Sequence, residues 1–258
     1  MEKMPVMFVG HGSPMNAIEN NDFTRKWAEI GKKINKPEII LSVSAHWVTN
    51  GSRVNDEADP KMVYDMYGFP QELYEVRYPA PGAPAMAVET INLLDQQVNV
   101  DNSWGIDHGT WSVLCRMFPQ ADIPVFQLSL DHRASAEAHF QIGQKLAALR
   151  EKGVLIMGSG NIVHNLARAN FSMADGYSWA YEFDEYIKEK IVGREFDQVI
   201  NYHQAGDSAK LVFHTTEHYN PLLYVLGASS ADDRLTIFNE SCTLGSISMT
   251  AYLFEERR

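Results

Sequence analysis

The sequence predicts an α/β protein with a single domain, built on a mostly parallel or mixed central sheet that has helices on both faces. Short apolar runs that suit buried strands alternate with segments of helical spacing, which is the pattern of βαβ units. No Gly/Ser linker, internal repeat or low-complexity tract divides the 258 residues. A hydrophobic content of 45% and a charged content of 21% are typical of globular proteins. We therefore expect residues 1–258 to form one catalytic or binding domain.

The expected elements follow one another from the first residues onward. Phe23, Trp27 and Ile30 recur at helical spacing behind Asn21, a residue type that caps helix N-termini, and they predict a helix. Segment 59–84 is rich in proline and aromatic residues and longer than a plain connector, so it is expected to form a lid or a pocket wall. Further helices are expected over 83–94, 134–150 and 178–192. Strands are expected over 5–9, 39–44, 123–130, 154–157, 235–238 and 246–254.

The charge of the chain restricts its partners. A formal net charge of −11 argues against nucleic-acid binding, which depends on Lys and Arg side chains that neutralise phosphates. No apolar run reaches the ~18 residues of a membrane span, and the first residues lack the apolar core of a secretory signal. We expect a cytoplasmic protein that acts on a small molecule, without a nucleic-acid or membrane partner.

Three of the nine histidines follow predicted strands. His11 comes after MPVMFV, His46 after IILSVSA, and His164 shortly after LIMGS. Because the C-terminal ends of parallel strands meet at one edge of a sheet, these side chains are expected to converge there. Taken singly, His11 suits a tight turn between two glycines, and His46 suits a half-buried residue bonded to the backbone. Together they favour a functional site.

Two more histidines open predicted helices. His218 lies behind Glu217 at the start of an apolar helical stretch, and His108 lies beside Asp107, a candidate to orient its ring. Each of the two histidines suits either a ligand that faces the site or an ordinary helix start. The other four are expected to be structural or exposed: His132, His139, His203 and His214.

Several imidazoles on converging loops, with no cysteine thiolates among them, indicate a catalytic metal centre rather than a structural zinc site. The HExxH helix of zinc proteases and the GxSxG turn of serine hydrolases are both missing from the sequence. The GSGN turn has neither the spacing nor the lysine of a phosphate-binding P-loop.

Seven separated segments stand out along the chain, in the order GHGSPMNAIE, SAHW, GFPQELYEVRYPAPGAP, WGIDHGTWSVL, PVFQLSLD, GSGNIVHNL and TTEHYNPLLYVLGA. Together they resemble the class III extradiol ring-cleavage dioxygenases of the 4,5-DOPA extradiol dioxygenase type. The resemblance implies a single α/β domain with a central mixed sheet and helices on both faces. It also implies an enzyme that uses a divalent metal to bind a catechol and O₂, and that opens the ring beside the diol to give a semialdehyde.

The same resemblance, applied motif by motif, implies roles for five histidines. The metal ligands match His11, His46 and His218. His164 matches the histidine that serves as acid and base, and it is a possible fourth metal ligand when no substrate is bound. His108 matches a second catalytic histidine close to substrate and O₂.

This sequence departs from the wider class at one ligand. Many members complete the set with a glutamate, whereas the matching position here is His218, with Glu217 next to it. Three neutral imidazoles suit zinc as well as iron, so one divalent metal per chain is expected, either Zn²⁺ or Fe²⁺. Two alternatives on the same histidines are a zinc-dependent hydrolase and a non-catalytic zinc- or catechol-binding protein. No substrate-binding residue is assigned from the sequence.

Overall fold

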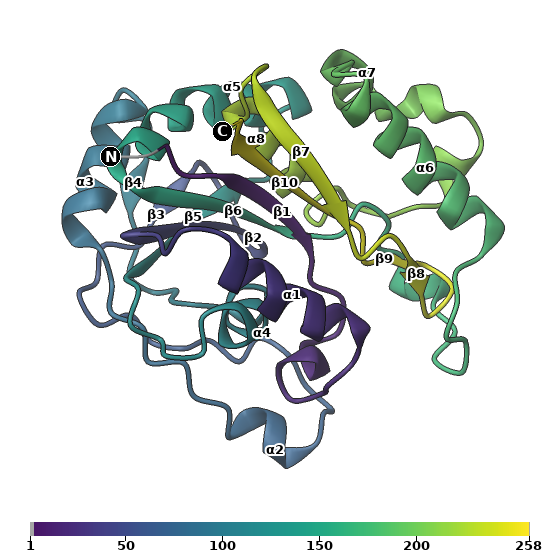
Figure 1. Ribbon diagram of the computed structural model, residues 1–258, viewed down its shortest axis with the longest axis horizontal. Helices are drawn as coiled ribbons and strands as arrows, with labels where there is room; N and C mark the ends of the chain where they lie inside the picture. Colours follow the sequence, from purple (N-terminus) through teal and green to yellow (C-terminus); the bar gives the residue numbers. More distant parts are fainter. Residues whose placement is uncertain (1–2, 258) are drawn as a thin grey trace.

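The computed structural model describes residues 3–257, which form a central sheet of eight strands with helices on both of its faces (Figure 1). The strand order is β4-β3-β5-β2-β6-β1-β10-β7. A separate ribbon pairs β8 (Cys242–Thr243) with β9 (Ile247–Ser248). The strands of the main sheet are β1 (Val6–Gly10), β2 (Ile39–Thr49), β3 (Arg53–Val54), β4 (Asn99–Val100), β5 (Val125–Asp131), β6 (Val154–Gly160), β7 (Asp233–Phe238) and β10 (Ala251–Glu256).

The helices connect these strands and pack on the sheet. The α-helices of the described residues are α1 (Asp22–Lys33), α2 (Gln71–Tyr74), α3 (Pro84–Leu93), α4 (His108–Met117), α5 (Ala136–Leu146), α6 (Ser178–Val192), α7 (Phe196–Ile200) and α8 (Asn220–Ala228). Short 3₁₀ turns cover Pro14–Ala17, Ala147–Lys152, Leu166–Arg168, Tyr202–Ala205 and Ser208–Lys210. None of the helices within residues 3–257 is both long and apolar enough to cross a bilayer.

The sheet is mixed, as the sequence predicted. Strands β5, β2, β6 and β1 run parallel to their neighbours in this central group, whereas β10 and β7 add to β1 in antiparallel directions. Strand β3 is antiparallel to β5 and parallel to β4. The parallel centre brings the ends of β1, β2 and β6 to the same edge of the sheet, where the histidines were expected.

Two apolar cores lie on the two faces of the sheet, and β1 contributes to both. Val6 and Phe8 belong to the core shared with α3, α5, α6, α7 and α8. Met7 and Val9 belong to the opposite core, shared with α1 and α4. This alternation follows from the two-residue period of a strand. It explains why all five residues of β1 are buried and why the chain shows a continuous apolar run rather than an alternating one.

Several elements match the expectations, whereas others differ in their bounds. Asn21 caps α1 in a capping box with Thr24, and α6 spans the expected residues. The expectation of one strand over 246–254 is wrong, because the chain divides into β9 and β10. A local hydrogen bond accompanies the break: the backbone N–H of Thr250 donates to the Ser248 hydroxyl at 3.2 Å rather than to a neighbouring strand.

A buried ion pair joins the 3₁₀ turn Ala147–Lys152 to the first residue of β7. Arg150 is fully buried and donates to both carboxylate oxygens of Asp233, at 2.8 and 3.0 Å. It also donates to the carbonyl groups of Met4 and Ala228, at 2.7 and 3.1 Å. One guanidinium therefore ties together four separate segments.

Arg150→Met is expected to lower the free energy of unfolding by about 3–5 kcal/mol, because it leaves the Asp233 carboxylate buried without a partner. Urea denaturation followed by circular dichroism measures the loss. Lys145→Met, which breaks an exposed pair with Asp95, serves as the control and should change little. Equal free energies of unfolding for the two variants would show that the buried Arg150–Asp233 pair does not hold these segments together.

Candidate metal centre

His11 is the first residue after β1 and is almost completely buried, with 1% of its surface exposed. Its backbone N–H donates to the carbonyl of Gly160 at 3.0 Å. The two flanking positions require glycine for different reasons. Gly12 has a φ of +60°, which favours glycine, whereas Gly10 lies against Met249, whose backbone carbon a Cβ would approach to 2.7 Å. Both glycines allow the chain to bend tightly around the histidine.

The hydrogen bonds of Ser159 fix the tautomer of His11. The Ser159 hydroxyl donates its single proton to the carbonyl of Gly109 at 2.6 Å. It can therefore only accept from Nδ1 of His11, which lies 2.9 Å away. Nδ1 then holds the ring proton, and Nε2 keeps the lone pair that a metal requires.

Ser159→Ala is expected to weaken metal binding about 10–100-fold, because loss of the outer partner frees the ring and its tautomer. Competition with a chromogenic chelator measures the affinity. Ser42→Ala is a matched control: Ser42 is equally buried, but its hydroxyl pairs with Thr110 rather than with a histidine. Equal affinities of both variants would remove Ser159 from the site.

His46 lies inside β2, not beyond its end as the sequence suggested, because β2 continues to Thr49. The pairing with β5 shifts register between Val43 and Val48, so His46 stands in an irregular part of the strand. Its ring packs against Gly109 of α4, where a Cβ would approach the ring to 2.9 Å. Its Nε2 atom is 3.1 Å from Nε2 of His11.

Asp65 contacts two of the histidines, and sequence reasoning did not single it out. Its Oδ2 atom lies 3.1 Å from Nδ1 of His46, and its Oδ1 atom lies 3.0 Å from Nδ1 of His108. Burial opposes ionisation, but the two histidines hold the pKa of this carboxyl well below its usual range. Burial also acts against the charged form of His46, yet the contact with Asp65 outweighs it and raises the His46 pKa. No motif marks Asp65 within the 59–84 segment.

Asp107 does not orient the ring of His108. Its carboxylate caps α4 by accepting from the backbone N–H of Thr110 at 3.2 Å, and it also accepts from Gln127 at 2.7 Å. His108 is the first residue of α4, and its backbone N–H donates to Asp65 at 3.1 Å. The carboxylate beside its ring is therefore that of Asp65.

His218 lies two residues before α8 and is buried. The backbone N–H of Asn161 donates to its carbonyl at 2.9 Å, which joins it to the residue after β6. Nδ1 of the ring is 3.6 Å from a Glu217 oxygen, and neither ring nitrogen has a hydrogen-bond partner within residues 3–257. A buried imidazole whose two nitrogens make no hydrogen bond needs another partner, such as a metal ion.

The ring nitrogens of His11, His46 and His218 converge, with one from each ring lying within 4.8 Å of the others. Burial, and then the neighbouring histidines, lower the pKa of His11 and of His218 well below the usual value, so both rings are neutral. The facing Nε2 atoms of His11 and His46 require either a proton on Nε2 of His46 or a cation between them. His11, His46 and His218 would hold a divalent ion at this point, so these residues fit a metal site.

His164 lies four residues beyond β6 and stacks on His218, with ring centroids 3.5 Å apart and planes 5° apart. Its ring nitrogens do not belong to the group of His11, His46 and His218 that could hold a metal. The role of His164 as a fourth ligand stays a prediction. Burial, followed by His46, lowers the pKa of His164 to about 4.

The remaining histidines lie outside this group. His139 is buried against Tyr224, with Nδ1 3.0 Å from the hydroxyl, and is structural as expected. His132, His203 and His214 are exposed, also as expected.

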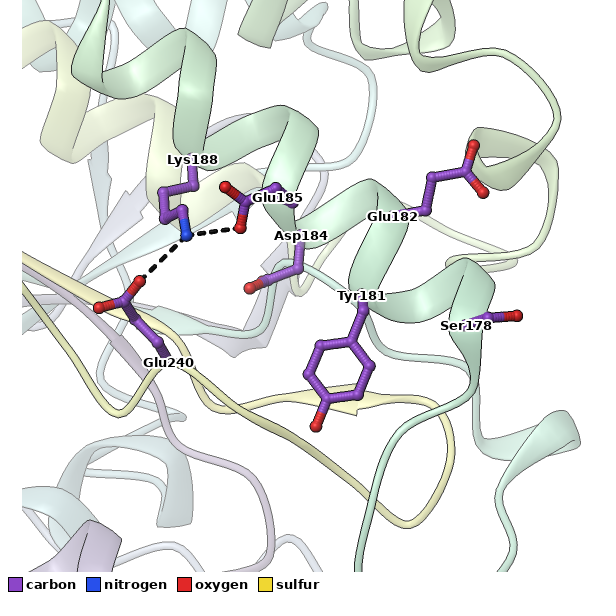
Figure 2. A pocket seen from close by; sticks show the side chains of 7 residues that line it. All are labelled: Ser178, Tyr181, Glu182, Asp184, Glu185, Lys188 and Glu240. Atoms are coloured by element: carbon purple, nitrogen blue, oxygen red, sulfur yellow. Dashed lines mark hydrogen bonds and ion pairs between the residues drawn. The ribbon is translucent and has the colours of Figure 1, made fainter.

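A cavity of about 520 Å³ along α6 contains none of the histidines (Figure 2). Lys188 in its wall is 2.5 Å from Glu185 and 3.2 Å from Glu240. Its mostly acidic lining offers no imidazole to a metal, so it is separate from the candidate centre. The lining residues are Ser178, Tyr181, Glu182, Asp184, Glu185, Lys188 and Glu240.

Comparison with known proteins identifies the family. Residues 4–255 match the family described as the catalytic LigB subunit of aromatic ring-opening dioxygenase. The chain belongs to this family. Its relatives include a 4,5-DOPA dioxygenase extradiol of Escherichia coli, 44% identical over 255 residues, with 96% of this chain and 93% of the relative covered. A protein of the same name from Beta vulgaris is 35% identical over 255 residues, with 96% of this chain and 95% of the relative covered.

The fold comparison agrees. The crystal structure of the uncharacterized protein JW3007 from Escherichia coli K12 has a TM-score of 0.85 and 41% identity, and covers 97% of this chain and 99% of that one. The resemblance found in the sequence motifs is confirmed: this LigB-family protein is an extradiol ring-cleavage dioxygenase. A metal is consistent with the family and with the three converging histidines.

Proposed function

We propose that this enzyme opens the ring of DOPA or a closely related catechol, using O₂ and one divalent metal per chain, with Fe²⁺ as the working ion and Zn²⁺ as an inactive substitute. The convergence of three buried imidazoles in a member of this family is the observation that supports it. The names of the relatives point to DOPA as the substrate class. A redox-active ion held by His11, His46 and His218 would supply Lewis acidity and electron transfer between catechol and O₂.

His164 is proposed to move the substrate proton. Burial lowers the pKa of His164 to about 4, so the ring is neutral at pH 7 and has a lone pair for the proton of a catechol hydroxyl, for which it is a weak base. The same low pKa makes the protonated ring a good acid, which returns the proton as the ring opens. The stacking on His218 holds His164 beside the metal ligands throughout.

His108 is proposed to contact the substrate or O₂ from the other side of the centre. Its ring centroid lies 3.9 Å from that of His46 and 5.8 Å from that of His11. Its ring nitrogens do not belong to the group of His11, His46 and His218 that fits a metal. This position suits a group that acts on the bound molecule rather than on the ion.

The remaining proposals concern the setting of the enzyme. We take residues 1–258 as one catalytic domain that works in the cytoplasm on small molecules. The net charge of −11 supports the lack of a nucleic-acid partner.

Anaerobic loading with Fe²⁺ or with Zn²⁺, followed by air and DOPA, tests the proposal. The iron form is expected to take up one O₂ for each ring opened and to produce the yellow semialdehyde, whereas the zinc form should produce none. No product from the iron form with DOPA or simpler catechols would contradict the proposal. Ester or amide hydrolysis by the zinc form without O₂ would replace it with a hydrolase.

A further inference from the structure

We propose that Asp65 is a positioning residue that fixes the tautomers of His46 and His108 together, so that one ring presents a lone pair to the metal and the other presents a lone pair to the substrate. The part that concerns His108 rests on the proposed function, whereas the part that concerns His46 requires only a bound metal. The supporting geometry is one carboxylate that lies 3.1 Å from Nδ1 of His46 and 3.0 Å from Nδ1 of His108.

The backbone around Asp65 is held firmly against α4. The Val63 N–H donates to the carbonyl of Ile106 at 2.8 Å, and the indole N–H of Trp111 donates to the carbonyl of Val63 at 3.0 Å. The backbone N–H of His108 donates to Asp65 itself at 3.1 Å. The carboxylate is therefore placed by the contacts of Val63, two residues before Asp65, and by the backbone N–H of His108.

A carboxylate accepts hydrogen bonds and donates none. A carboxylate at these distances repels a lone pair that faces it, so each ring favours a proton on Nδ1 and a lone pair on Nε2. Nδ1 of His108 has no aligned hydrogen bond within residues 3–257, so its contact with Asp65 acts through charge. For His46, Nε2 is the atom that lies 3.1 Å from Nε2 of His11, at the metal position. For His108, a neutral ring then accepts a hydrogen bond or proton from the substrate, with Asp65 stabilising the charge that forms, as in other Asp–His pairs.

Asp65 also belongs to a second group of possible ligands, since His46, Asp65 and His108 offer atoms within 4.8 Å of one another. Two observations favour the positioning role. Oδ1 of Asp65 is already engaged by the backbone N–H of His108, and both ring contacts have hydrogen-bond distances. A second ion is therefore treated as an outcome of the test.

The test uses the full chain loaded with Zn²⁺ and compares wild type with Asp65→Asn, which keeps the shape but turns one acceptor into a donor. Asp59→Asn makes the same chemical change at an exposed position of the same segment and is the matched control. Zinc affinity is measured by chelator competition, and the ring tautomers by ¹⁵N NMR of labelled histidine. Neither measurement needs catechol or O₂, so they can succeed or fail independently of the proposed function.

In wild type, both rings are expected to hold their proton on Nδ1. In Asp65→Asn, zinc affinity should fall about 10–100-fold. The amide oxygen should keep the bond from the His108 backbone N–H, so the NH₂ group faces Nδ1 of His46, and His46 should move its proton to Nε2. The iron form should lose kcat with little change in KM for DOPA. Asp59→Asn should match wild type.

Wild-type rings protonated on Nε2 would overturn the proposal, and this measurement stands even if Asp65→Asn fails to fold. Unchanged zinc affinity and tautomers in Asp65→Asn would also overturn it. Two zinc ions per wild-type chain, reduced to one in the variant, would make Asp65 a metal ligand instead.

Discussion

His11→Ala is expected to leave the protein folded but unable to retain its metal. The ring contributes one of three converging nitrogens, and its Nε2 is committed to the metal side by the bond from Nδ1 to Ser159. Loss of a direct ligand should cost more than the about 10–100-fold in affinity that follows loss of an outer partner. Metal content after dialysis, measured by mass spectrometry, and chelator competition both report the change.

His132→Ala, which removes an exposed histidine, provides the control and should keep one metal per chain. If His11→Ala held a full complement of metal with unchanged affinity, His11 would be removed from the ligand set. The same outcome for His218→Ala would leave the unpartnered nitrogens of that ring unexplained.

His164→Ala is expected to lower kcat about 10²–10⁴-fold, the range typical of a lost acid–base group, while metal content stays near that of wild type. The ring stacks on a ligand without sharing its plane, so its loss should spare the metal. Turnover of DOPA by the iron form and metal analysis of the same samples give the two readouts.

His203→Ala removes an exposed ring and should have normal turnover. Loss of metal in His164→Ala would support the fourth-ligand role that the family resemblance allows. Normal turnover with full metal would show that the proton is moved by another group, and His108 beside Asp65 would be the next candidate.

The position of the candidate site could be predicted from the sequence because strand ends and histidines coincide. The parallel strands β1 and β6 bring His11 and the segment before His164 to the same sheet edge, as the apolar runs suggested. His46 was expected just beyond its strand, but it stands in an irregular part of β2. Periodicity does not reveal such a register shift, because the shift depends on pairing with β5.

Asp65 could not be predicted for a different reason. Its partners are 19 residues before it and 43 residues after it along the chain, and its own segment has almost no regular structure. Asp107 adjoins His108 in sequence and was therefore the natural candidate to orient it. In the fold, the carboxylate of Asp107 is directed into the N-terminus of α4, and a residue from a distant loop takes that role. Proximity along the chain does not show where a side chain points.

The position of the metal tests the proposed ligand set most directly. Crystals loaded anaerobically with Fe²⁺ and measured at the iron absorption edge are expected to show one anomalous peak per chain. The peak should lie about 2.1 Å from ring nitrogens of His11, His46 and His218, as for imidazole ligands in general. A peak between His46, Asp65 and His108, or no peak in protein that cleaves DOPA, would contradict the assignment of His11, His46 and His218 as the metal ligands.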